Sequence, residues 1–239
     1  MEIFFFIIIV ILASLVGGTV GFGSNLIAMP LILTFLAKEP AISSMAIANI
    51  VLGGFLIRKI PGKANLRLGA ILFLSSLAGM PIGIWILKVI PMEIMKVLVG
   101  SLAIFFVLAV CSGKIRLPKS VFLTSVAGFF SGLLSTSTNM SGPPVVLLLM
   151  GQDIPKDEFR KTLTAFFLSI GIVSLLLFFA NQIVNSQGAV LGLIAAPFVI
   201  LGAFFGNMIS EKLPQKLFRF LAMAIVLLSG ACGIFSGLR

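Results

Sequence analysis

The sequence contains no histidine and no tyrosine, and it has one tryptophan and two cysteines in 239 residues. Its seven acidic residues all lie at the ends of apolar segments: Glu2, Glu39, Glu93, Asp153, Asp157, Glu158 and Glu211. An acid–base pair, a nucleophile activated by histidine, or a cluster of metal ligands would require such residues inside the fold. The sequence therefore predicts a protein that is not an enzyme and that binds no metal or other cofactor.

Cys111 and Cys232 lie in apolar segments and lack the CxxC spacing of a redox or zinc motif. We expect both thiols to be small packing residues. Trp85 lies near the end of an apolar segment, where the amphipathic indole ring is typical of an anchor at the membrane interface.

Apolar residues make up 59% of the chain and charged residues only 10%, which is less than half the usual charged share of a soluble domain. The chain is therefore predicted to be an all-α polytopic membrane protein. The first 15 residues lack the basic start and the cleavage site of a signal peptide, so we include them in the fold. Six segments have about the length of a membrane-spanning helix: residues 41–57, 68–87, 97–112, 162–180, 188–209 and 220–237.

Two further apolar stretches are interrupted in the middle by polar residues. Residues 3–37 contain GGTVGFGSNLIAMP, and residues 121–151 contain SGLLSTSTNMSGPP. A continuous helix over the first stretch would measure roughly 50 Å, which is too long for one crossing. Each stretch should therefore fold back, either as a re-entrant hairpin or as one full and one short helix.

The two broken stretches can be superimposed at an offset of 114, which matches Gly18 with Gly132, Asn25 with Asn139 and Pro30 with Pro144. A second offset, of 123, covers later segments. Its matches are Gly79 with Gly202, Gly83 with Gly206, Pro91 with Pro214 and Lys96 with Arg219. These offsets predict two halves, residues 1–113 and 114–239, each with a broken or re-entrant hairpin followed by three transmembrane helices. A duplicated broken helix indicates a transport site near the membrane midplane.

Basic residues indicate how the halves are oriented, because Lys and Arg concentrate in cytoplasmic loops. The chain has four basic clusters, near residues 58–67, 114–119, 156–161 and 212–219, whereas residues 181–187 carry no charge. If each broken stretch returns to the side from which it entered, all four clusters lie inside. The halves are then inverted repeats. The net charge of +10 needs no nucleic-acid partner, because these loops face anionic lipids of the cytoplasmic membrane.

Polar residues at the two breaks form the predicted substrate site. Such groups are tolerated at membrane depth only when they are buried in protein or line a cavity. Glycines in both breaks, Gly132 and Gly142 included, are expected to allow non-helical backbone, although close helix packing is an alternative role for Gly17 and Gly18. The candidate ligand-binding residues are Gly21, Gly23, Ser24, Asn25, Ser137, Thr138, Asn139, Ser141, Gly142 and Arg160.

A new helix should begin after each break, and its first amide groups would favour an anion. Pro143 and Pro144 are typical of a first helical turn. Asn25 and Asn139 can cap these helices, bind a ligand, or do both. Arg160 could attract an anion from the cytoplasmic side, or it could anchor the loop or pair with an adjacent carboxylate. Because the interior carries no acidic residue, the expected cargo is a small oxyanion and not a cation.

At these residues the chain resembles the TauE/SafE family of sulfite and sulfonate exporters. The resemblance rests on GGTVGFGSNLIAMP, on SGLLSTSTNMSGPPVVLLLM and on DIPKDEFRKTLTAFFLSIGIVSLLLFF, and it extends over essentially the whole chain. It departs from the family at STSTNM, where members often carry glycines. The resemblance implies transport, by export, of sulfur-containing anions such as sulfite, sulfonates or sulfoacetate across the cytoplasmic membrane.

Two other functions are compatible with parts of the sequence. A membrane scaffold or assembly factor would not need two matched polar breaks, and a membrane enzyme acting on lipid phosphates would need ionisable residues at them. The expected partners are a small anionic substrate and membrane lipid, without nucleic acid. The choice among anions, the coupling ion and the oligomeric state, including a homo-oligomer, stay open at this point.

Overall fold

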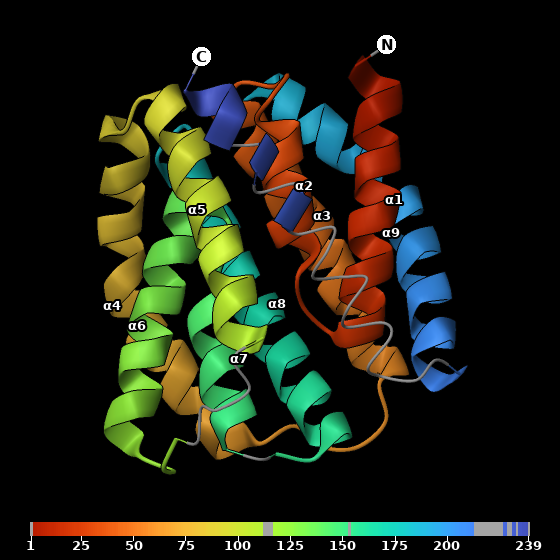
Figure 1. Ribbon diagram of the computed structural model, residues 1–239, viewed down its shortest axis with the longest axis vertical. Helices are drawn as coiled ribbons and strands as arrows, with labels where there is room; N and C mark the ends of the chain where they lie inside the picture. The colour runs from red at the N-terminus through yellow and green to blue at the C-terminus, as the bar shows by residue number, and fades with distance from the viewer. Residues whose placement is uncertain are drawn as a thin grey trace.

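The computed structural model describes residues 2–111, 117–152 and 154–212, and short pieces near the C-terminus at 227–228, 231–232 and 234–238. Within these ranges every element of regular structure is a helix (Figure 1). The helices are α1 (Glu2–Val20), α2 (Ser24–Ile32), α3 (Lys38–Lys59), α4 (Leu66–Val89), α5 (Met92–Cys111), α6 (Val121–Thr138), α7 (Gly142–Gly151), α8 (Lys156–Ala180) and α9 (Ser186–Lys212).

Six of these helices are long and apolar enough to cross a membrane: α1, α3, α4, α6, α8 and α9. Their outward side chains are large and apolar; Phe122, Leu193 and Leu74 are each at least 66% exposed. Trp85, on the last turns of α4, is 65% exposed. A surface of this composition would be poorly solvated in water and is suited to lipid, so the chain is a multi-spanning membrane protein. The segment predicted at residues 220–237 lies largely outside the described residues.

Both apolar stretches that were too long for one crossing are broken helices. The first divides into α1 and α2, and the second into α6 and α7. The chain turns back after each break, so that α2 packs beside α1 and α7 beside α6 (Figure 1). The connections after α3 and α7 lie at the lower end of Figure 1, and those after α2, α4 and α8 lie at the upper end.

Close helix packing holds the bundle together at two interfaces, α1 with α9 and α4 with α6. Glycine makes both possible. A Cβ added to Gly18 would lie 2.7 Å from the carbonyl oxygen of Ala203, and one added to Gly132 would overlap the backbone of Ser76. Small residues allow such close backbone approach in membranes, where no hydrophobic effect drives helices together. Gly18 is therefore a packing residue, the alternative that the sequence left open.

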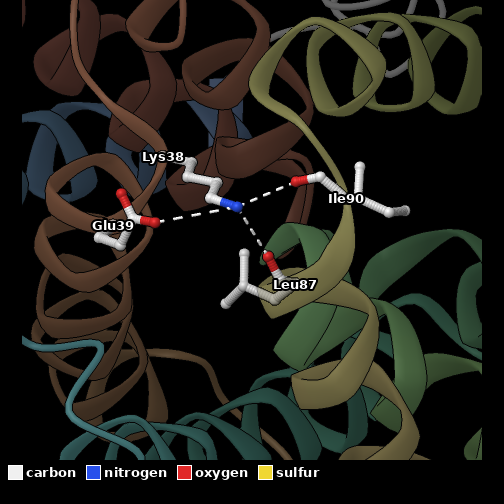
Figure 2. Close-up of polar contacts among 4 residues, drawn as sticks. All are labelled: Lys38, Glu39, Leu87 and Ile90. Atoms are coloured by element: carbon white, nitrogen blue, oxygen red, sulfur yellow. Dashed lines mark hydrogen bonds and ion pairs between the residues drawn. The ribbon is translucent and has the colours of Figure 1, made fainter.

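Lysine side chains bind the carbonyl groups at two helix ends. Figure 2 shows Lys38, the first residue of α3, donating to the carbonyl oxygens of Leu87 (3.0 Å) and Ile90 (2.9 Å), with the carboxylate of Glu39 at 3.9 Å. Lys161 of α8 donates in the same way to Ile60 at the end of α3 (2.7 Å). A cation is favourable at a helix C-terminus, where the last carbonyls lack intrahelical partners. These contacts fix α3 against α4 at one end and against α8 at the other.

One of the two cysteines, Cys232, differs from the expectation. Cys232 is an exposed free thiol, so the packing role predicted for it is wrong. In a membrane protein an apolar segment can present a small thiol to lipid without burying it, which composition alone does not reveal. The side chain of Cys111 lies outside the described residues, as do Pro214 and Arg219 of the predicted repeat matches and the basic residues Lys114, Arg116 and Lys216.

Candidate functional site

A cavity of about 70 Å³ lies where the two breaks meet. Its walls come from the two breaks and from α3 and α8, which cross the centre of the bundle. The volume exceeds the roughly 10–15 Å³ that one water molecule needs, so a small ion has room there. The lining residues from the first break are Gly17, Gly21, Phe22, Gly23, Ser24, Asn25 and Leu26, and those from the second are Ser135, Asn139, Met140, Ser141 and Gly142.

The first break depends on two glycines in the left-handed region. Gly21 has φ 87° and Gly23 has φ 93°. Residues with a Cβ rarely adopt this conformation, because the Cβ approaches the following carbonyl. Gly21 N–H still donates to Gly17 O at 2.8 Å, which ends α1, and Gly23 is the N-cap of α2. The helix axis can therefore reverse within three residues.

The second break uses different chemistry. Asn139 is the left-handed residue, with φ 59°, and it caps the C-terminus of α6. Gly132 lies within α6, and Gly142 begins α7 without a positive φ, so the prediction that these two glycines supply non-helical backbone is wrong. Asparagine tolerates the left-handed region because its short side chain bonds locally. Pro143 and Pro144 occupy the first turn of α7, as predicted.

Asn25 and Asn139 join the two breaks directly. The Asn25 side-chain amide Nδ2 donates to the backbone carbonyl of Asn139, and the Asn139 amide donates to the carbonyl of Ile42 in α3 at 3.2 Å. Neither side chain caps α2 or α7, since those helices have no side-chain cap bond. Asn25 and Asn139 therefore do not serve as side-chain caps of the helices that follow the breaks, which was one of the roles considered for them.

The helix contacts favour an offset four residues larger than the one predicted between the two broken stretches. In the structure Gly206 packs on Leu15 and Gly83 packs on Leu133. The two glycines are 123 positions apart, as expected, but the leucines are separated by 118 and not by 114. Glycines recur four residues apart on these helices, and a shift of one turn presents the same helix face. Sequence matching therefore could not distinguish the two registers.

Most residues that line the cavity form pairs that are 118 positions apart. Gly21 and Asn139, the first left-handed residue of each break, are 118 positions apart, as are the N-caps Gly23 and Ser141. Seven further pairs of lining residues share this offset: Gly17/Ser135, Phe22/Met140, Ser24/Gly142, Ala46/Thr164, Asn49/Phe167, Leu52/Ile170 and Gly53/Gly171. Only Asn25, Leu26 and Leu56 of the lining have no partner in the lining at this offset.

Two polar atoms in the cavity wall lack hydrogen-bond partners in the described structure. They are Oδ1 of Asn25 and Oγ1 of Thr164, and each is shielded from solvent. A buried polar group without a partner costs free energy, on the order of 1–3 kcal/mol. A third polar side chain in the wall, Asn49, accepts from the hydroxyl of Ser24 at 3.2 Å. Asn25, Asn49 and Thr164 are thus polar residues of the cavity wall.

Three of the predicted site residues lie elsewhere. The hydroxyls of Ser137 and Thr138 donate back to the carbonyls of Leu133 (2.8 Å) and Leu134 (3.0 Å), and neither residue lines the cavity. Arg160 is buried, and its guanidinium donates to Gly18 O at 2.8 Å and to Asn207 Oδ1 at 3.2 Å. The other seven predicted residues line the cavity together.

Sequence reasoning missed Asn49 and Thr164. Both lie within ordinary spans, among other small polar residues, and only the crossing of α3 and α8 shows that they face the breaks. The available signal was weak. Gly53 lies about one helical turn after Asn49, and Gly171 lies about two turns after Thr164. These two glycines are 118 positions apart, which is the offset that also relates the two breaks. None of the described residues that line the cavity has an ionisable side chain, and the described residues include no group of three metal-ligating side chains.

An apolar bundle whose broken helices meet at a neutral polar cavity is typical of membrane transport proteins. The chain belongs to the sulfite exporter TauE/SafE family, whose model matches residues 6–232. Membership of this family favours transport over catalysis. Neither the comparison with curated proteins nor the comparison with solved structures finds a match.

Proposed function

We propose that the protein is a secondary transporter that exports small sulfur-containing anions, such as sulfite or a sulfonate, across the cytoplasmic membrane. The observation that carries the proposal is the cavity between the two breaks, where the N-termini of α2 and α7 meet without any ionisable side chain in the wall. The family description supports sulfite or a related anion as cargo, and export as the direction.

An anion can be held at such a site by neutral donors alone. The first amide groups of a helix lack intrahelical partners and carry a partial positive charge. The amide groups that open α2 supply most of this, because Pro143 and Pro144 remove two N–H groups from α7. Charge-assisted hydrogen bonds contribute about 1.5–3 kcal/mol each, so several can offset dehydration. Without a buried lysine or arginine in the wall, the anion is not held too tightly to leave.

The ligand-contacting residues in this proposal are the seven predicted residues of the lining together with two found in the structure. They are Gly21, Gly23, Ser24, Asn25, Asn139, Ser141 and Gly142, with Asn49 and Thr164. Arg160 contributes by position only, because its side chain packs beside Gly21 and binds the end of α1.

We also propose that the chain consists of two inverted repeats, each with a re-entrant hairpin followed by three helices. The offset of 118 across the cavity wall supports this arrangement, as does the exchange of partners, in which α1 packs on α9 and α6 on α4. Basic residues occur in the last turn of α3 and in the first turns of α8. Both lie at the end of the bundle that also holds the connection after α7 (Figure 1). That end would face the cytoplasm.

Two other functions account for less of the structure. A scaffold or assembly factor gives no reason for two polar breaks that meet at one cavity. A lipid-phosphate enzyme would need an acid, base or nucleophile there, and the described part of the cavity wall contains no ionisable side chain.

A ligand screen followed by transport tests the proposal. Purified protein should be stabilised against heat by sulfite or by a sulfonate more than by carboxylates, with sulfate and thiosulfate as further arms. Proteoliposomes should then exchange radiolabelled sulfite. Gly142→Leu, which places a large side chain in the cavity wall, should stop exchange, whereas Ser169→Ala, on the exposed face of α8, should not. The proposal fails if no sulfur anion stabilises the protein, or if exchange persists in the Gly142 variant.

A further inference from the structure

We propose that the protein binds the phosphate group of an anionic phospholipid in a second pocket, between the start of α4, the start of α6 and the connection from α7 to α8, with Arg67 and Lys119 as the residues that contact it. This pocket shares no lining residue with the cavity between the breaks. The inference therefore does not depend on which anion the protein transports.

The pocket has a volume of about 340 Å³, which lies within the roughly 300–1,000 Å³ of sites for small molecules. It lies at the lower end of Figure 1, where the connections after α3 and α7 are found. Its polar lining residues include Arg67, Lys119, Ser120, Thr124, Gln152 and Glu158. Basic pockets between membrane helices at such an end are suited to anionic lipid headgroups.

The charges in the wall favour an anion. Glu158 is the one acidic residue of the described lining, and its Oε1 accepts from Asn65 Nδ2 at 2.9 Å, while the Asn65 N–H donates to Thr162 Oγ1 at 2.9 Å. These bonds tie the carboxylate into the wall. Arg67 and Lys119 are exposed, and neither forms an ion pair or a hydrogen bond with another described residue. Both cations can therefore contact a phosphate, which arginine binds in a bidentate manner and lysine as a point charge.

A corresponding pocket lies at the opposite end of the bundle. It has a volume of about 400 Å³ and is formed where α1 begins, where α2 ends and where α9 begins. The two linings correspond in pairs: Ile3/Val121, Phe6/Thr124 and Leu36/Ile154 are 118 positions apart, and Arg67/Val190, Leu68/Leu191 and Ile71/Ile194 are 123 positions apart. The fold therefore forms a pocket of this shape at both ends.

The two pockets differ in chemistry. Val190 occupies the position of Arg67, and the buried Phe6 occupies that of Thr124. Because apolar residues suffice at the upper end, the shape of the pocket does not require charged side chains. The preference for lysine and arginine on the cytoplasmic side would be met anywhere in the lower connections. A headgroup site gives a reason for their position inside this pocket.

Apolar side chains beside the pocket indicate a lipid and not a soluble phosphate. Leu66 precedes Arg67 and is 81% exposed, and Phe122 follows the lining residue Val121 and is 73% exposed. Large apolar side chains on the outer surface of a membrane protein are suited to acyl chains. A phospholipid can therefore place its phosphate at the two cations while its chains lie against these residues.

Lipid binding to the purified full chain tests the inference. Phosphatidylglycerol added in detergent should raise the melting temperature and should bind at least about tenfold more tightly than phosphatidylcholine, which has no net charge. Arg67→Gln and Lys119→Gln should each weaken phosphatidylglycerol binding by at least about fivefold. Arg58→Gln and Lys59→Gln are the matched controls, because both residues are exposed in the last turn of α3 and neither lines the pocket. They should change binding by less than about twofold.

Thr124→Phe provides a second arm. It introduces the residue of the corresponding pocket and should weaken phosphatidylglycerol binding by at least about fivefold, while the melting temperature of the lipid-free variant shows whether it is folded. Equal affinity for the two lipids, or equal losses in the control and pocket variants, would overturn the inference. Stabilisation by glycerol 3-phosphate or inorganic phosphate to the same extent as by phosphatidylglycerol would also overturn it, because the ligand would then be a soluble anion.

Discussion

The two breaks reach the same geometry through different residues. In the first, glycines at positions 21 and 23 adopt the left-handed backbone, and in the second a single asparagine does so, followed by two prolines in the next helix. The first break also supplies Asn25, whose side chain reaches across to the second. Similar backbone shape therefore does not imply similar chemistry. The first break carries Asn25, and the second has fewer amide donors, because Pro143 and Pro144 have no N–H group.

The largest expected effect comes from closing the cavity at either break. Gly23→Leu and Gly142→Leu should both abolish transport, because each side chain would enter the lining. Their stabilities should differ. Gly23 has φ 93°, so leucine there costs about 1–2 kcal/mol of backbone strain. Gly142 does not have a positive φ, and a Cβ added there would lie 3.9 Å from Phe167 Cζ, which is an ordinary contact. Thermal unfolding measures this difference; equal melting temperatures would contradict the account of the first break.

Arg160 should affect stability more than affinity. Arg160→Met removes a charged donor from the last carbonyls of α1, and losing such a bond costs about 1.5–3 kcal/mol. Because Arg160 does not line the cavity, sulfite affinity in the folded protein should change by less than about twofold. Melting temperature and ligand titration separate the two effects. A large loss of affinity in a variant of normal stability would restore Arg160 as an anion-attracting residue.

The asparagines should have an intermediate effect on binding. Asn25→Leu and Asn139→Leu each remove hydrogen-bonding capacity at a shielded site, which should weaken sulfite binding by at least about 1 kcal/mol, or fivefold. Titration of the purified variants under conditions where both are folded is the measurement. Wild-type affinity in both would remove the asparagines from the site.

The smallest effect should come from converting the second break to the chemistry of the first. Asn139→Gly keeps the left-handed backbone and loses only the bond to Ile42, so it should lower stability by about 1 kcal/mol or less. Asn139→Val should be worse, because a β-branched residue is strained at positive φ. If the two variants have the same melting temperature, the left-handed backbone at Asn139 does not contribute to the difference in stability that we predict.

Much of this fold follows from the sequence, because membrane helices are set by length and apolarity. The segments at 41–57 and 162–180 fall within α3 and α8, and both breaks lie where glycine and polar residues interrupt an overlong stretch. Each overlong stretch was predicted to fold back because of its length, and the structure divides each into two helices that pack side by side. The placement of lysine and arginine predicted that each stretch returns to the side of the membrane from which it entered, and this stays a prediction.

The details of the site followed less well, for reasons of helix geometry. Four consecutive hydroxyl residues in α6 point in different directions, about 100° apart, so Ser135 lines the cavity whereas Ser137 and Thr138 bond to their own helix. Asn49 and Thr164 could be identified only once the packing of α3 on α8 was known. Sequence matching at an offset of 114 also paired Asn25 with Asn139, whereas in the structure Asn139 shares its left-handed backbone with Gly21.

The central claim, that both breaks touch one bound anion, can be tested by protection from alkylation. Cysteine would be placed at Ser24 or at Ser141, which line the cavity from opposite breaks, in a chain whose Cys111 and Cys232 are replaced by alanine. We predict that sulfite slows alkylation at both positions with the same half-maximal concentration, and that it leaves a cysteine at Ser169, on the exposed face of α8, unaffected. Protection at only one break, or at neither, would contradict the account.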